Sequence, residues 1–100
     1  MLIVLAQATV PEGALDAARD AIAAMVAASR AEEGCIAYTF TTDVLDPTRL
    51  HIVEKWRDED ALKFHFSTPH MAAFQAAIAD TGVQVTEALK FETGEGASLF

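Results

Sequence analysis

The sequence is poor in cysteine and in positive charge. Its single cysteine, Cys35, cannot form an internal disulfide, so nothing in the chain calls for an oxidising compartment. Lysine and arginine together number 7 against 15 aspartate and glutamate residues, which gives a formal net charge of −8. The few bases are scattered along the chain. The composition therefore argues against a nucleic acid partner and against binding to an anionic membrane surface.

The sequence also lacks a long hydrophobic run. The apolar residues 1–6 have no basic segment before them and lead directly into Gln7 and Thr9, which is typical of a strand rather than a signal peptide. The longest other apolar run, residues 21–28, is far too short to span a bilayer. From these absences we expect a soluble protein of the cytoplasm with no membrane partner.

Motifs of nucleophilic and cofactor-dependent enzymes are missing as well. There is no Gly-x-Ser-x-Gly elbow, no phosphate-binding loop and no dinucleotide fingerprint. A zinc site is not expected either, because the chain has only 3 histidines, and His65 and His70 are separated along the chain with Pro69 between them. The sequence therefore predicts no metal and no cofactor.

The chain does contain enough apolar material for a single domain over residues 1–100, since 52% of the sequence is hydrophobic. Alternation of apolar and polar residues predicts four strands, over residues 2–10, 35–42, 49–56 and about 83–92. Apolar residues at three- and four-residue spacing predict a helix over about 15–31, with Gly34 as a plausible C-cap.

A second helical segment is expected in two parts between the third and fourth strands. Asp58 is placed to cap the first part, and Thr68-Pro69 begins the second, because threonine caps well and proline is tolerated at the first helical position. Gly82 ends it. The order of elements predicts an α+β, ferredoxin-like β-α-β-β-α-β fold, with a four-stranded antiparallel sheet and the helices on one face.

The other face of this sheet still carries large apolar residues on at least the first and third strands. Such a face is rarely left in water, so we expect a homodimer in which two sheets pack face to face. The tail, residues 94–100, is expected to be flexible or to pack on the dimer partner, since it ends in the apolar pair Leu99-Phe100.

Three segments resemble the antibiotic biosynthesis monooxygenase (ABM) family. They are Glu32-Glu33-Gly34-Cys35 with Tyr38 after it, Glu54-Lys55-Trp56, and His65-x-x-Thr68-Pro69-His70. The resemblance covers nearly the whole chain and is nearest to the quinol monooxygenase-like members. It implies a dimeric α/β barrel. In many members it also implies oxygenation of a quinol or related phenol by O2 without metal, flavin or nicotinamide.

Two other branches of the family suggest alternative functions for this chain. Heme-degrading members use an axial histidine further along the second helix, at a position where this chain has Gln75, so the resemblance disfavours heme. Members that isomerise a phosphorylated quorum-sensing sugar derivative share the Thr-Pro-His segment, but they tend to lack a tryptophan where this chain has Trp56. The resemblance therefore favours the oxygenase branch and keeps the isomerase as an alternative.

The two histidines are the candidate catalytic residues. An imidazole near a pocket can take a proton from a phenol at neutral pH, so His65 or His70 is the expected general base. The alternative is that both are half-buried and hydrogen-bond the backbone at the helix break. His65 ranks first because it shares a turn with Leu62 and Phe66, beside the inward face of the helix.

Four further residues are candidates for contact with the substrate. Trp56 is interpreted as an aromatic wall or as core, and Glu54 either orients a histidine or pairs with a basic residue. Tyr38 shares the cavity of Trp56 or packs with its hydroxyl at the surface. Gln7 faces a cavity or is exposed near a strand end. Three functions fit these residues: a cofactor-independent monooxygenase, a small-molecule binding module without catalysis, and the sugar-derivative isomerase.

Overall fold

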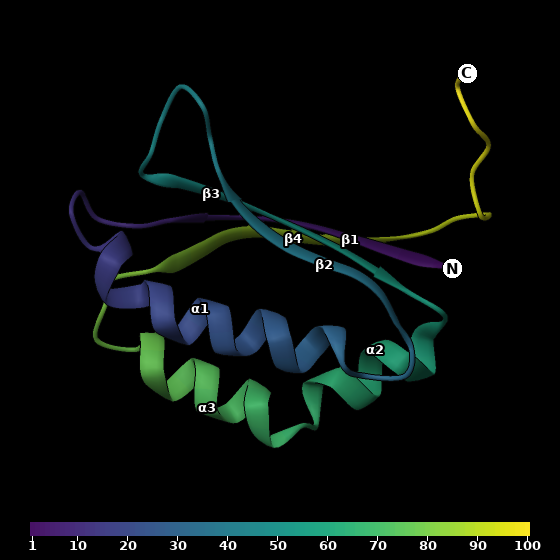
Figure 1. The fold of residues 1–100 in the computed structure, drawn as a ribbon, viewed down its shortest axis with the longest axis horizontal. Helices are drawn as coiled ribbons and strands as arrows, with labels where there is room; N and C mark the ends of the chain where they lie inside the picture. The colour runs from purple at the N-terminus through teal and green to yellow at the C-terminus, as the bar shows by residue number, and fades with distance from the viewer.

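The computed structural model describes residues 1–100 as one antiparallel sheet covered on one side by helices (Figure 1). The elements in chain order are β1 (Leu2–Thr9), α1 (Leu15–Arg30), β2 (Cys35–Thr42), β3 (Arg49–Trp56), α2 (Glu59–Phe66), α3 (Pro69–Ile78) and β4 (Gln84–Glu92). The predicted ferredoxin-like α+β fold is confirmed, with its second helix divided into α2 and α3. None of the three helices has the length and hydrophobicity that crossing a membrane requires.

The strand order in the sheet is β2-β3-β1-β4, and all neighbouring strands are antiparallel. The first strand is therefore internal, with Leu2 opposite Trp56 on one side and opposite Glu92 on the other. Just beyond β4, the Thr93 backbone N–H donates to the Met1 carbonyl at 2.9 Å. The sheet thus joins the first and last elements of the chain.

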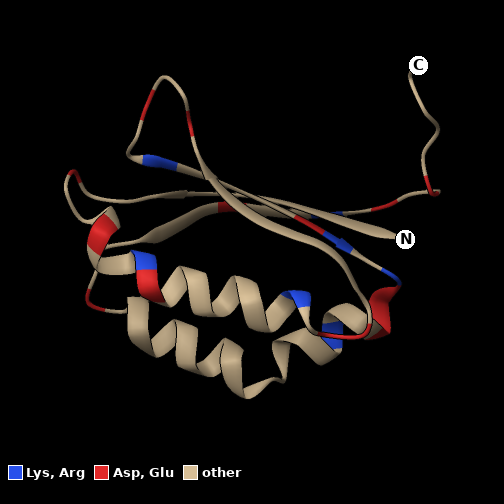
Figure 2. Ribbon diagram, viewed as in Figure 1, with Lys and Arg blue, Asp and Glu red and all other residues tan.

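The two faces of the sheet differ because side chains alternate along each strand. On β1, Leu2, Ala6 and Ala8 are buried beneath the helices, while Ile3 and Leu5 point to the other side. The buried side chains form two clusters under the helical layer, which are Leu2, Met25, Tyr38, Trp56, Ala61 and Leu62 in one and Ala8, Val10 and Leu50 in the other. In the helical layer, the central turns of α1 and all of α3 carry no charged residue (Figure 2).

The sheet face away from the helices, called the open face below, keeps the apolar character that the sequence predicts. Its large side chains come from neighbouring positions of the three strands β1, β3 and β4, and they are Leu5, Val53, Leu89 and Phe91, all more than a third exposed. Figure 1 shows the β2–β3 loop and the C-terminal tail both rising on this side of the sheet. The open face is therefore apolar and flanked by two projecting segments.

The break between α2 and α3 is built by the two predicted caps. The Asp58 carboxylate accepts from the Ala61 backbone N–H at 2.9 Å and begins α2. The Thr68 hydroxyl accepts from the Met71 backbone N–H at 3.3 Å and begins α3, with Pro69 in its first turn. The same hydroxyl donates to the His65 carbonyl at 2.7 Å. One residue thus ends one helix and starts the next.

The expectation for Gly34 is wrong. Helix α1 ends at Arg30 with Ala31 as its C-cap, and Gly34 has an ordinary negative φ. The physical reason for a glycine here is a close approach, because a Cβ on Gly34 would collide with the side chain of Ala61 on α2. The turn after α1 is therefore packed directly against α2.

Candidate functional site

Three side chains from distant parts of the chain meet between the end of α1 and the break between α2 and α3. The Nδ1 atom of His65 lies 2.7 Å from Oε2 of Glu32, and the Nε2 atom of His70 lies 2.7 Å from the same oxygen. The side chains of Glu32 and His65 are only 5% and 1% exposed, whereas that of His70 is 25% exposed. We call this group the Glu32–His65–His70 cluster.

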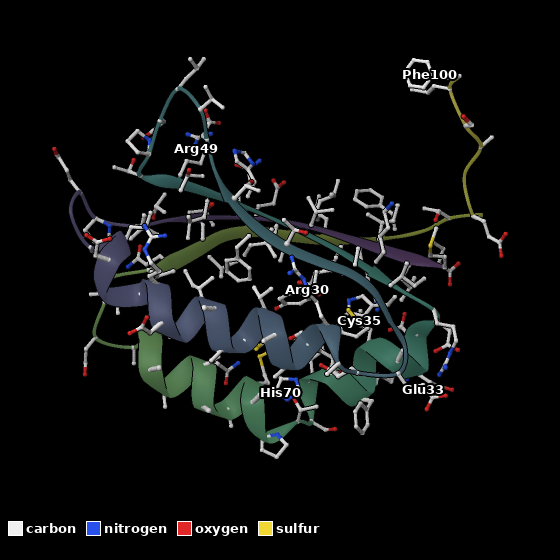
Figure 3. The ribbon with its side chains drawn as sticks, in the orientation of Figure 1. Arg30, Glu33, Cys35, Arg49, His70 and Phe100 are labelled. Atoms are coloured by element: carbon white, nitrogen blue, oxygen red, sulfur yellow. The ribbon has the colours of Figure 1, made fainter.

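The helix break brings the two histidines together. Because α2 stops after Phe66 and α3 begins at Pro69, the chain changes direction between His65 and His70. Their ring centroids lie 6.0 Å apart as a result. Figure 3 shows His70 on the side of α3 that faces α1. The expectation that the intervening Pro69 keeps the two imidazoles apart is therefore wrong.

The geometry of the cluster fixes where its protons are. A carboxylate oxygen can only accept, so both imidazoles must donate to Oε2 of Glu32, His65 through Nδ1–H and His70 through Nε2–H. Two buried atoms are then left without any partner, Nε2 of His65 and Oε1 of Glu32. In the neutral imidazole, Nε2 of His65 is an acceptor with a free lone pair. The cluster thus presents a basic nitrogen whose ring is held by a carboxylate.

The ring of His65 rests on the aromatic residues of the sheet. Its centroid lies 4.6 Å from that of Trp56 and 5.4 Å from that of Tyr38. Trp56 is fully buried, and its indole N–H donates to Oε1 of Glu54 at 2.9 Å. The structure therefore brings His65, Trp56, Tyr38 and Glu54 together in one buried group beneath the helices.

Burial sets the acid–base behaviour of the two sheet residues. Desolvation raises the pKa of Glu54, and the hydrogen bond from Trp56 and the electrostatic influence of His65 act in the opposite direction. Desolvation, and then the negative charge of Glu54, raise the pKa of the Tyr38 phenol well above its usual value. Tyr38 is therefore a neutral hydroxyl at physiological pH and is not suited to act as a base.

Several expectations for these residues need correction. The histidines hydrogen-bond a carboxylate, not the backbone, and His65 is fully buried instead of half-buried. Glu54 pairs with tryptophan and not with a basic residue. The carboxylate that holds the histidines is Glu32. It was not among the predicted site residues, because 33 residues separate it from His65 and no spacing rule connects the two.

Gln7 is the one predicted site residue that the structure does not bring to this group. It lies between Ala6 and Ala8, which are buried under the helices, so strand alternation places it on the open face. Its neighbours in register are His51 on β3 and Glu87 on β4. The sheet itself therefore separates Gln7 from His65 and His70.

Two grooves adjoin the cluster and its helices. One of about 610 Å³ runs along the end of α1 and the helix break, and Glu32, His70, Arg57, Phe64 and Pro69 are among its walls. The other, of about 390 Å³, lies between α2 and the sheet, with Leu62, Phe66, Val4 and Ala88 among its apolar walls. The ring of Phe66 lies 5.7 Å from that of His65, so this second groove is one side chain away from the buried imidazole.

The family model for antibiotic biosynthesis monooxygenases matches residues 1–77 of the chain. The chain belongs to this family. The matched part contains Glu32, Trp56, His65 and His70, and hence the whole cluster and its aromatic support. The three segments that carried the resemblance in sequence are the segments that meet in space.

The chain is similar to solved structures and to curated proteins. The structure of a protein described as an antibiotic biosynthesis monooxygenase from Deinococcus radiodurans superposes with a TM-score of 0.89 at 22% identity, covering 100% of this chain and 99% of that one. Rv0793 from Mycobacterium tuberculosis superposes with a TM-score of 0.83 at 26% identity, covering 97% and 98%. YcnE of Bacillus subtilis is 42% identical over 52 residues, which are 52% of this chain and 55% of YcnE. The chain spans about half the length of the curated relatives it matches.

Proposed function

We propose that this chain is a cofactor-independent monooxygenase that oxidises a quinol or related phenol with O2, and that His65 is its general base. The observation that carries the proposal is the buried Glu32–His65 pair. It leaves Nε2 of His65 without a partner, next to Trp56 and Tyr38. A carboxylate that holds one nitrogen of an imidazole orients the ring and stabilises the imidazolium formed when the other nitrogen takes a proton.

The first step is the transfer of the phenolic proton to Nε2 of His65. Glu32 then faces a positively charged imidazole at 2.7 Å. His70 donates to the same carboxylate oxygen and so acts as a positioning residue for Glu32. Because Glu32 and His65 are buried, their mutual attraction is weakly screened by water and their geometry is held through the step.

The remaining chemistry belongs to the substrate and O2. The phenolate supplies electrons to O2, and one oxygen atom forms a bond to a ring carbon that carries hydrogen. The O–O bond of this adduct breaks, the second oxygen leaves as water, and the ring carbon becomes a carbonyl. The two hydrogen atoms of the water come from the phenol and from that carbon. All electrons come from the substrate, so no external reductant is required.

The groove between α2 and the sheet suits such a substrate. Its volume of about 390 Å³ is within the usual range for small-molecule sites, and most of its walls are apolar. A flat phenol in this groove would reach His65 past the ring of Phe66. The half-exposed Phe66 side chain has room to move, because 62% of the residue is accessible to solvent.

Oxygen uptake with a panel of hydroquinones tests the proposal, with each substrate's own autoxidation as the baseline. Wild-type protein should consume O2 well above this baseline. Glu32→Gln and His65→Gln should lower turnover by roughly 10²-fold or more, the usual size of an acid–base contribution. Glu33→Gln is the matched control, since its exposed carboxylate contacts only Arg57, and it should keep wild-type turnover.

Two results would contradict this function, and a third would contradict the assignment of the base. If the panel binds without O2 uptake, the chain is a small-molecule binding module. If a phosphorylated sugar derivative is isomerised without O2 uptake, the isomerase alternative holds. If Glu32→Gln and His65→Gln both fold and turn over quinol at the wild-type rate, the cluster is structural and the base assignment is wrong.

We also propose that the working unit is a homodimer joined through the open face. The apolar side chains of β1, β3 and β4 support this, as do the projecting loop and tail beside them, which can reach a partner. The cytoplasm stays the predicted location, because the single cysteine has no disulfide partner in the chain.

A further inference from the structure

We propose that Glu32, His65 and His70 form a binding site for a single divalent transition-metal ion of the zinc type. The donor atoms of the three side chains all lie within 4.8 Å of one another. Two of the three residues are buried, and no ionisable side chain from elsewhere in the fold shares their hydrogen bonds. This inference goes beyond the proposed function and does not depend on it.

The donor set has the right chemistry for such an ion. Two neutral imidazoles and one carboxylate, with a water in the remaining position, are a recurrent zinc ligand set in proteins. The ligands come from three rigid places, which are the turn after α1, the last turn of α2 and the first turn of α3. A site built in this way is largely formed before the ion arrives.

The geometric change needed to admit an ion is confined to side chains. Zinc–ligand bonds of about 2.0–2.1 Å place the ligand atoms of a tetrahedral site roughly 3.3 Å apart. The two contacts of 2.7 Å to Oε2 of Glu32 must therefore lengthen by about 0.6 Å, and the donor atoms, which now lie within 4.8 Å of one another, must come closer where they are farther apart than this. Glu32 lies in the turn beyond α1 and not inside a helix, so its side chain can move by the first of these distances, and the partly exposed His70 side chain can supply the second.

An unpartnered atom of the cluster points to the same conclusion. Oε1 of Glu32 is buried and makes no hydrogen bond, so the carboxylate has an unused ligand atom. When His65 binds the ion through Nδ1, its proton moves to Nε2. Metal binding thus uses a carboxylate oxygen that the hydrogen bonds of the cluster leave free.

The ion has a route to the site. The groove of about 610 Å³ has both Glu32 and His70 in its walls, so one side of the cluster faces a cavity that can hold water. The net charge of −8 attracts cations to the protein as a whole. Water from the groove would complete the coordination.

Equilibrium dialysis and titration calorimetry with Zn2+, and absorption spectroscopy with Co2+ as a probe, test this site on full-length protein stripped with a chelator. Wild type should bind one ion per chain and give the intense visible bands of tetrahedral Co2+. Glu32→Gln and His70→Gln each remove a ligand and should weaken binding at least tenfold. Their circular dichroism should remain that of the wild type, since His70 is partly exposed and glutamine keeps the size of Glu32.

Two controls separate this site from adventitious binding. Glu33→Gln alters the adjacent carboxylate, and His51→Gln alters the remaining histidine, which contacts Asp43 at 3.0 Å at the base of the β2–β3 loop. Both should bind as the wild type does. Binding that survives Glu32→Gln and His70→Gln, or that is lost in His51→Gln, overturns the site, as does an absence of binding in the wild type.

The metal test and the oxygen-uptake test can fail independently, because dialysis contains no substrate. Zinc in the cluster should also stop quinol turnover, since the ion takes the nitrogen through which Glu32 orients His65. Chelator should restore the activity. Binding without inhibition would keep the metal site and count against His65 as the base.

Discussion

At the scale of single residues, Glu32 determines the character of the site. One carboxylate oxygen accepts from two imidazoles that are attached to different helices. Removing that oxygen would leave two ring N–H groups without their partner, one of them fully buried. An unsatisfied buried polar group costs about 1–3 kcal/mol, so Glu32 also contributes to the stability of the helix break. The Glu32 side chain therefore both positions the two imidazoles and supplies the negative charge of the site.

Glu54 gives a prediction for the pH dependence of stability. Its pKa is raised above 4.5 in the folded protein, mainly by burial. Above this value the unfolded chain loses the proton more readily than the folded one, so Glu54 lowers stability as pH rises through this range. Glu54→Gln keeps an oxygen for the Trp56 indole and removes the ionisation. The free energy of unfolding, measured with urea between about pH 4 and 7, should rise in the variant relative to wild type as pH increases.

The comparison is internally controlled. All other titrating groups are common to wild type and Glu54→Gln, so the difference between their free energies of unfolding at each pH isolates the effect of Glu54. Two parallel stability curves would mean that Glu54 has the same pKa in the folded and unfolded chains. If the advantage of the variant instead falls as pH increases, the hydrogen bond from Trp56 lowers the pKa of Glu54 by more than burial raises it.

At the scale of secondary-structure elements, the contact between Gly34 and α2 sets the position of the cluster. Gly34→Ala should cost about 1–3 kcal/mol through overpacking against Ala61, measured by urea unfolding. Gly94→Ala is the matched control, because nothing lies within 4 Å of a Cβ at that position, and it should leave stability nearly unchanged.

A second substitution makes this prediction specific. Ala61→Gly removes the methyl group that the new Cβ would meet, so the double variant should be more stable than the sum of the two single changes predicts. If the two effects simply add, the glycine is needed for another reason. The double variant should also recover the ion affinity and activity that a displaced α2 would lose.

Helices and strands whose formation depends on residues close together in the sequence could be predicted, and contacts between elements far apart in the sequence could not. The alternating strand residues, the Asp58 cap and the Thr68-Pro69 cap are readable because each depends on neighbours within a few positions. Gly34 was misjudged because its neighbour, Ala61, is distant in sequence. The meeting of Glu32 with His65 depends on the packing of α1 against the helix break, which no local pattern records. Only the resemblance to the family drew attention to both the segment that contains Glu32 and the segment that contains His65.

At the scale of the whole molecule, the open face predicts the assembly state. Wild-type protein should sediment at equilibrium as a dimer at micromolar concentration, because the apolar side chains of this face are too exposed to remain in water. Leu5→Lys places a charge in the middle of the face and should give a monomer. The folded monomer should survive, since Leu5 is 45% exposed within the chain and a lysine there can reach solvent.

Ala27→Lys serves as the control for this substitution. It adds the same charge on an exposed position of α1, in the helical layer, and should leave the dimer intact. A stable wild-type monomer would exclude the proposed interface. A dimer that persists in Leu5→Lys and dissociates in Ala27→Lys would place the interface on the helices.

The internal position of β1 has a consequence for how the protein is made. β1 is synthesised before both of its neighbours in the sheet, which are β3 on one side and β4 on the other, and β4 follows all the other elements of the domain. Until β4 arrives, an apolar strand that contains Leu2, Ile3, Val4 and Leu5 has one unpaired edge and one uncovered face. The nascent domain is therefore exposed to aggregation until β4 has been synthesised. Slow elongation would lengthen that interval, and chaperones that hold extended apolar segments would protect it.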